Sequence, residues 1–134
     1  MSQQGGCQCG AVRYEVSGSP QHVALCHCEG CRKSAGAPAV AWAAFAETEF
    51  QLLQGVLTDF NSSGAAIRSF CPSCGTGITY RNEDMLPGIV DIQSATLDDP
   101  SVFPLQCHIQ IAERINWMAA AHTLPEFERF PSNV

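Results

Sequence analysis

The sequence predicts a mainly β fold: small antiparallel sheets braced by bound metal, with one or two short helical turns. Three observations lead to this prediction. Short segments of alternating or β-branched residues recur along the chain, glycine and proline punctuate them, and seven of the eight cysteines fall into three tight clusters. A chain of 134 residues, 46% of them hydrophobic, can bury one core, so we expect a single domain over residues 1–134.

The predicted strands are short, as is typical of an all-β domain. The first, residues 11–16, alternates polar and apolar side chains and ends at a Ser-Gly-Ser-Pro turn. The other predicted strands, in chain order, are 23–25, 40–45, 50–53, 56–60, 67–70, 77–80, 88–94 and 108–111. Helix is scarce, and we expect only one turn at residues 32–35 and another within 124–130.

The clustered cysteines indicate metal binding rather than disulfide bonding. The first six residues lack the charged start and apolar core of a signal peptide, and no apolar run reaches membrane-spanning length. We therefore expect a cytoplasmic protein without membrane association. Thiols stay reduced in that compartment, where clustered cysteines more often bind metal than form disulfides.

The sharpest local motif is Cys-Pro-Ser-Cys-Gly at residues 71–75, which predicts a zinc knuckle. Cys71 and Cys74 reach one ion from a tight turn, and Gly75 permits a positive φ just after the second ligand. A tetrahedral shell needs two further ligands. Cys7 and Cys9 are the natural partners because their use leaves the middle cluster whole, whereas the rival pairing takes two thiolates from that cluster.

Cys26, Cys28 and Cys31 form the middle cluster, and three thiolates leave one coordination position open for water or substrate. Alternatively, Cys107 or a histidine completes a second closed site. His27 lies between ligands and is predicted to be a neighbour or hydrogen-bond partner rather than a ligand. Cys107 lies in an apolar segment and is predicted to be a buried free thiol. The tryptophans predicted to lie in the core are Trp42 and Trp117.

Two basic residues, Arg32 and Lys33, follow Cys31 directly. They are candidates for holding anionic groups of a substrate next to the metal. The alternative is a solvated positive turn that offsets the negative field of the thiolates. Further candidate anion-binding residues are Arg68, Arg81 and Arg114.

The charge of the chain disfavours a nucleic-acid surface. The formal net charge is −6 with neutral cysteines. A zinc ion held by four thiolates contributes −2 and one held by three contributes −1, so the metal-loaded protein would stand near −9. Since the seven basic residues are also scattered along the chain, we expect no nucleic-acid partner.

The three cysteine clusters, with their flanking residues, resemble the glutathione-dependent formaldehyde-activating family, also called the CENP-V/GFA domain. The likeness covers nearly the whole chain, because matching residues continue to its closing segment. The matching segments are Gly6-Cys7-Gln8-Cys9-Gly10 with Val12-x-Tyr14, Cys26-His27-Cys28-x-x-Cys31-Arg32-Lys33, Phe70-Cys71-Pro72-x-Cys74-Gly75-Thr76, Leu97-Asp98-Asp99-Pro100, His108-Ile109, Trp117 and Leu124-Pro125-x-Phe127-x-x-Phe130-Pro131.

The resemblance implies an Mss4-like fold and two zinc ions of different roles. The implied ligands of a structural zinc are Cys7, Cys9, Cys71 and Cys74. The implied ligands of a second, more labile catalytic zinc are Cys26, Cys28 and Cys31. The implied activity is that of a carbon–sulfur lyase, in which formaldehyde and glutathione combine to S-(hydroxymethyl)glutathione.

The expected partners are therefore a small thiol such as glutathione and a small aldehyde, and Arg32 and Lys33 would orient the glutathione carboxylates. Three alternatives remain open. The first is a carrier that binds a thiol, an aldehyde or zinc without turnover. The second is an enzyme acting on another small electrophile, and the third is a protein-interaction module. Fold analogy alone supports the last of these weakly. The sequence leaves the oligomeric state open.

Overall fold

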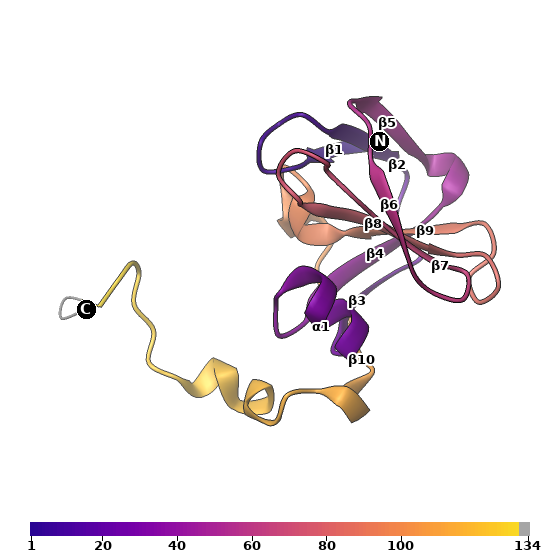
Figure 1. Ribbon diagram of the computed structural model, residues 1–134. Coiled ribbons are helices and arrows are strands. Elements are labelled where there is room, and N and C mark those ends of the chain that lie inside the picture. The colour runs from indigo at the N-terminus through magenta and orange to yellow at the C-terminus, as the bar shows by residue number, and fades with distance from the viewer. Residues whose placement is uncertain (132–134) are drawn as a thin grey trace.

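The computed structural model describes residues 1–131, and within this range the strands form two sheets (Figure 1). The smaller sheet is antiparallel, in the order β1-β2-β5, and consists of β1 (Ser2–Gly6), β2 (Arg13–Ser17) and β5 (Phe50–Gln54). The strands of the larger sheet are β3 (His22–Cys26), β4 (Val40–Ala46), β6 (Thr58–Ser63), β7 (Ala66–Phe70), β8 (Gly77–Asn82), β9 (Ile89–Gln93) and β10 (Cys107–Ile109).

The larger sheet has the order β10-β3-β4-β9-β8-β7-β6. The predicted mainly β fold with small sheets is therefore confirmed, with one difference. β10 pairs with β3 in parallel, so the larger sheet is mixed rather than antiparallel. No helix within residues 1–131 combines the length and the apolar character that crossing a bilayer requires.

The single α-helix of the described chain, α1 (Glu29–Ala35), is longer than the turn predicted at residues 32–35. Its N-cap is Cys28, whose Sγ accepts a hydrogen bond from the N–H of Cys31, so a cysteine fills a place usually taken by serine or aspartate. Gly36 ends the helix at φ 63°. The short 3₁₀ segments are η1 (Glu47–Glu49), η2 (Ser94–Thr96), η3 (Pro100–Val102), η4 (Ile111–Glu113) and η5 (Asn116–Thr123).

The helical turn predicted within residues 124–130 is wrong. The residues there have no helical structure, and the helical segment η5 ends one residue earlier, at Thr123. Pro125 explains the boundary, because the proline ring disfavours helical backbone at the residue before it. Leu124 accordingly has extended backbone, with φ −72° and ψ 154°.

The main core lies between the two sheets. Tyr14 and Val16 of β2, with Val12 just before it, pack against residues of the larger sheet such as Phe45 and Ile92. A second cluster lies where α1 meets the larger sheet, and it consists of Cys26, Cys31, Val40 and Trp42. The burial predicted for Trp42 is thus confirmed.

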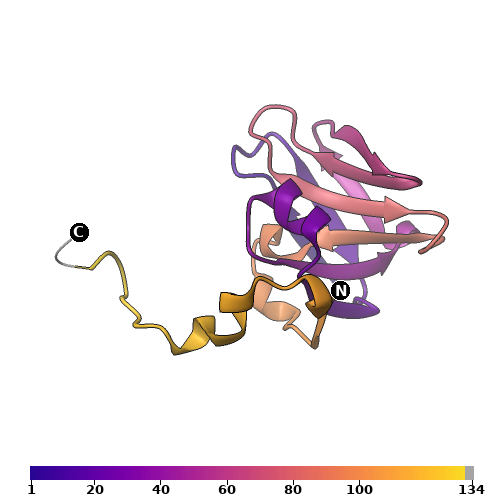
Figure 2. The same cartoon turned by 60° about the horizontal axis from the view of Figure 1, so that its bottom comes forward.

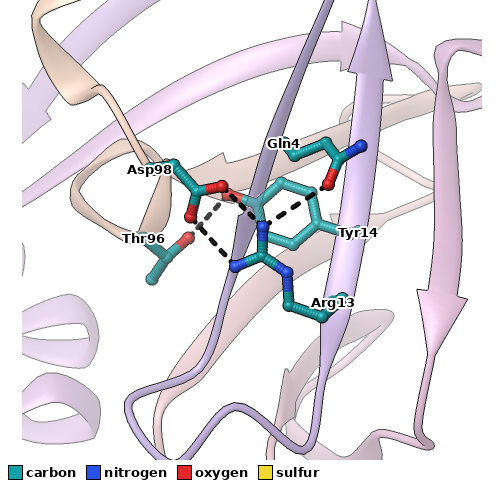
Figure 3. Close-up of polar contacts among 5 residues, drawn as sticks. All are labelled: Gln4, Arg13, Tyr14, Thr96 and Asp98. Atoms are coloured by element: carbon teal, nitrogen blue, oxygen red, sulfur yellow. Dashed lines mark hydrogen bonds and ion pairs between the residues drawn. The ribbon is translucent and has the colours of Figure 1, made fainter.

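Polar contacts fasten the smaller sheet to the loop after β9, as Figure 3 shows. Nη1 of Arg13 donates to Oδ1 of Asp98 at 2.9 Å, and the hydroxyls of Tyr14 and Thr96 lie 2.7 Å apart. Gly5 of β1 lies so close to this loop that a Cβ there would stand 2.6 Å from the Thr96 carbonyl oxygen. These contacts place Cys7, which follows β1 directly, beside the core.

Two predictions of burial are wrong, one for a residue in the outer strand β10 and one for a residue beyond it, where the chain leaves the sheets. Figures 1 and 2 show residues 110–131, here called the C-terminal arm, leading away from the rest of the molecule. Trp117 lies in this arm and is 58% exposed. Cys107 is exposed because it lies in β10, an outer strand of the larger sheet.

Candidate metal centres

Two similar turns carry the cysteines of the first candidate centre. In one, the N–H of Gly10 donates to the carbonyl of Cys7 at 3.2 Å, and in the other the N–H of Gly75 donates to the carbonyl of Cys71 at 2.9 Å. Gly10 and Gly75 have φ values of 83° and 82°, which favour glycine. The positive φ predicted for Gly75 is therefore confirmed, and the first cluster forms a knuckle of the same kind.

The two turns bring four thiols together. The sulfur atoms of Cys7, Cys9, Cys71 and Cys74 all lie within 4.8 Å of one another. Sγ of Cys9 lies 3.6 Å from that of Cys7 and 3.8 Å from that of Cys71. Tetrahedral zinc with Zn–S bonds of about 2.3 Å holds its sulfur ligands about 3.8 Å apart, so this donor set fits zinc.

Thr76 joins the two turns, and sequence reasoning assigned it no role. Its Oγ1 accepts a hydrogen bond from the N–H of Gln8 at 3.1 Å and lies 3.2 Å from Sγ of Cys74. The hydrogen bond from this hydroxyl, together with backbone donors, lowers the pKa of Cys74 to about 5. Thr76 therefore favours the thiolate that metal binding requires.

The second candidate centre lies where β3 ends and α1 begins. Sγ of Cys26, in the last residue of β3, lies 3.6 Å from Sγ of Cys31 in α1, and Cys28 is the N-cap between them. These three sulfur atoms also lie within 4.8 Å of one another. Within the described residues neither Cys107 nor a histidine joins the group. We call Cys26, Cys28 and Cys31 the cysteine trio.

The thiols of the trio differ in pKa. Hydrogen bonding from Cys26, and then from Cys28, Trp42 and Arg68, lowers the pKa of Cys31 to about 5 against the opposing effect of burial. The pKa of Cys26 is raised, chiefly by its side-chain hydrogen bond with Cys31 and then by burial. One thiolate is thus already formed near neutral pH, which favours capture of a cation.

Arg68 of β7 lies beside the trio. Its Nη1 and Nη2 lie 3.9 and 3.8 Å from Sγ of Cys31, and Nη1 donates to Oγ of Ser34 at 3.2 Å. The guanidinium stacks on the Tyr80 ring, 5.0 Å from its centroid. Arg68 was one of three arginines that the sequence offered as anion-binding candidates, and its position at the trio depends on strand pairing that no local motif reveals.

The other candidate cations lie elsewhere. Lys33 forms an ion pair with Glu29 at 3.5 Å on the exposed side of α1. Arg32 is half-buried, and its Nε has no hydrogen-bond partner among the described residues. Arg81 pairs with Glu47 at 2.8 Å, and Arg114 lies in the C-terminal arm.

His27 has the position predicted for it, next to ligands and outside the group of sulfur atoms. Its Nε2 lies 2.9 Å from Nδ1 of His108, and the two rings stack with their centroids 5.1 Å apart. Burial, together with the charges of His108 and Arg114, lowers the pKa of His27. The neutral imidazole therefore holds β10 against the segment that carries the trio.

A cavity of about 310 Å³ is lined by residues that neighbour the two centres, although no cysteine of either centre lines it. Ser34 and Arg68 line it on the side of the trio, and Gly75 lines it on the side of the knuckle. Its walls include the rings of Trp42 and Phe60. Neither Arg32 nor Lys33 lines it. The cavity is thus mostly apolar with one cation, next to the thiolate of Cys31.

A buried carboxylate lies on the same face of the larger sheet. Asp91 of β9 is opposite Tyr80 of β8, and its Oδ1 has no hydrogen-bond partner among the described residues. Burial raises the pKa of Asp91 to about 6, with His22 opposing the shift and Cys31 adding to it. The charged form of Asp91 is therefore costly in the folded protein.

Replacing Asp91 with asparagine is expected to stabilise the protein at pH 8. Because the folded pKa lies above the unfolded value, wild-type stability falls as the pH rises from about 4 through about 6. The variant escapes this loss, so its advantage is about 2–3 kcal/mol at pH 8 and shrinks towards pH 5. Urea unfolding at both pH values measures it, and Asp84→Asn at an exposed position is the control. Equal destabilisation at both pH values would contradict the prediction.

Comparison with known proteins gives a family match and a structural match. Residues 2–113 match the protein family described as "Glutathione-dependent formaldehyde-activating enzyme". The crystal structure of a Rhodobacter sphaeroides protein is similar, with a TM-score of 0.63 and 23% identity over 78% of this chain and 98% of the other. At this identity the second result establishes a shared fold.

Proposed function

The chain belongs to the glutathione-dependent formaldehyde-activating enzyme family, and on that premise we propose that it is a zinc-dependent carbon–sulfur lyase. Its substrates would be a thiol such as glutathione and a small aldehyde such as formaldehyde, which combine to S-(hydroxymethyl)glutathione or a related adduct. The observation that carries the proposal is the cysteine trio next to a cavity that Arg68 lines. The cavity would give a substrate room next to Arg68, whose Nη2 lies 3.8 Å from Sγ of Cys31 in the trio.

The two centres would have different roles because they have different numbers of ligands. Cys7, Cys9, Cys71 and Cys74 would close a tetrahedral shell around a structural zinc. The trio would hold the second zinc with one position open. When bound there, zinc supplies Lewis acidity and favours the thiolate form of an incoming thiol. Both centres need reduced thiols, which supports a cytoplasmic location.

Arg68 would bind a carboxylate of the thiol substrate. The three thiolates of the trio leave the zinc centre with a net charge of −1, which opposes the approach of an anionic substrate. The guanidinium of Arg68 offsets that charge and faces the cavity, whereas Arg32 and Lys33 do not line it. That Arg32 and Lys33 contact glutathione remains a prediction, and Arg68 is better placed for the role.

The remaining walls of the cavity would bring the reactants together. Trp42 and Phe60 present apolar surface that excludes water from the reacting groups. Holding the thiol and the aldehyde in one small cavity removes the entropic cost of a bimolecular encounter. This contribution needs no further charged side chain.

The direct test is exchange NMR on an equilibrium mixture of formaldehyde, glutathione and S-(hydroxymethyl)glutathione. Zinc-loaded protein is expected to accelerate interconversion beyond the uncatalysed rate, and chelator-treated protein is the control. Unchanged exchange with tight glutathione binding would support a carrier instead of an enzyme. Unchanged exchange without glutathione binding would contradict the proposed substrate.

Replacing Arg68 with glutamine is expected to raise KM for glutathione about tenfold or more, since a charge-assisted hydrogen bond contributes about 1.5–3 kcal/mol. KM for 2-mercaptoethanol, which has no carboxylate, should change little. Steady-state kinetics with both thiols measure the difference. The matched control is Arg81→Gln, whose guanidinium pairs with Glu47. An equal loss with both thiols would mean that Arg68 does not recognise the carboxylate.

A further inference from the structure

The C-terminal arm has an apolar surface that its own chain leaves uncovered. No residue between Asp98 and Pro131 is buried, and Figures 1 and 2 both show residues 110–131 extending away from the sheets. Its large exposed apolar residues are Ile111, Trp117, Leu124, Phe127 and Phe130. Such a series of exposed side chains on one segment marks an interaction surface rather than ordinary scatter.

The conformation of the arm also requires packing that its own chain does not supply. Its segment η5 has eight residues of 3₁₀-helix, whereas isolated 3₁₀ runs beyond three or four residues are uncommon. Among the described residues, the hydrogen bonds of 114–131 stay within the arm. Glu113 makes the last hydrogen bond to the rest of the chain, accepting from the N–H of Glu29. Short helical segments depend on tertiary packing, so a surface beyond the arm itself would stabilise it.

The domain offers a groove that suits such an arm. It has a volume of about 610 Å³, and its apolar lining includes Pro20, Val23, Val102 and Pro104. Pro104 shortly precedes β10, after which the arm begins, so the groove lies near the base of the arm. In the described structure no side chain of the arm lines it.

We propose that the arm of one copy packs on a second copy of this chain, with its aromatic side chains in the groove formed by Pro20, Val23, Val102 and Pro104. Arm and groove then belong to the same molecule at equal concentration, and a twofold axis fills both grooves through reciprocal exchange. The small net charge of the arm makes its contact with a second copy less repulsive than direct contact between the β-sheet domains of two copies. The arm carries three acidic and two basic residues, a net −1 of the total −6.

Sedimentation velocity of the zinc-loaded full chain tests the proposal. Wild type is expected to sediment as a dimer of the 14.4 kDa chain at micromolar concentration. Phe127→Ser should raise the dimer dissociation constant about tenfold or more, and Val102→Glu should do the same from the groove side. The matched control is Phe60→Ser on β6. Phe60 and Phe127 are exposed to the same extent, 59% and 60%, but Phe60 lies outside the arm and the groove. All three positions are exposed, and circular dichroism verifies that each variant is folded.

Isotope-filtered NOE spectra of mixed ¹³C-labelled and unlabelled chains locate the contact. Intermolecular NOEs between the Phe127 ring and the Val102 methyl groups would support arm exchange. A monomeric wild type, or NOEs between these residues within one chain only, would overturn it. Dissociation by Phe60→Ser with no effect of Phe127→Ser would also overturn it, because the copies would then associate through β6.

Discussion

Replacing Cys71 with serine is expected to abolish the folded state. Cys71 is fully buried in the main core, and its Sγ lies 3.8 Å from Sγ of Cys9. A structural zinc contributes about 10–16 kcal/mol of apparent binding free energy, which is as large as the whole stability of a small domain. Loss of one of the four proposed ligands would remove most of that contribution and leave a polar hydroxyl in the core.

Two measurements check this prediction: zinc content per purified chain, and thermal unfolding followed by circular dichroism. Cys71→Ser should bind less zinc and show no cooperative transition. Cys107→Ser is the matched control, since Cys107 is exposed and outside both clusters. A Cys71→Ser protein that unfolds cooperatively near the wild-type temperature would show that the four-cysteine centre does not hold the fold together.

Replacing Cys28 with serine is expected to abolish activity while the fold persists. Cys28 supplies one of the three thiols of the trio and also caps α1 through its sulfur atom. Serine is a preferred N-cap residue, so its hydroxyl can replace the sulfur as the acceptor of the Cys31 N–H. The thiolate ligand is lost, and the helix start is kept.

The expected result is about one zinc per chain instead of two, a melting temperature close to that of wild type, and glutathione–formaldehyde exchange at the uncatalysed rate. Metal analysis, circular dichroism and exchange NMR measure the three quantities on one sample. Cys107→Ser again serves as the control and should retain exchange. Turnover that survives in Cys28→Ser at full rate would exclude the trio as the reacting centre.

Much of the sheet structure could be predicted because alternation and punctuation are local signals. The predicted segments 40–45 and 50–53 differ from β4 and β5 by one residue at one end. β1 has no such signal, since Ser2–Gly6 contains two glutamines and two glycines, and it forms only through pairing with β2. The parallel pairing of β10 is likewise a tertiary event that no local pattern encodes.

The same distinction applies to the candidate centres. The spacing of the cysteines predicts the trio and each of the two pairs, because thiols that share a turn are neighbours in sequence, whereas the joining of the two pairs is a long-range contact. The contacts of Arg68 with Cys31 and of Thr76 with Gln8 join residues far apart in sequence, so the sequence offered at most a weak candidate. Trp117 and Cys107 were predicted to be buried, but Trp117 lies beyond the last strand and Cys107 lies in the outer strand β10.

The four-cysteine centre unites segments that emerge from the ribosome at different times. Sixty-two residues separate Cys9 from Cys71, which is roughly 3–12 s of synthesis at about 5–20 residues per second. The trio emerges within that interval, so five thiols are available to metal before the native partners of Cys7 and Cys9 exist. If the four-cysteine centre holds zinc as proposed, newly made chains pass through a period in which the ion could join cysteines other than its final ligands.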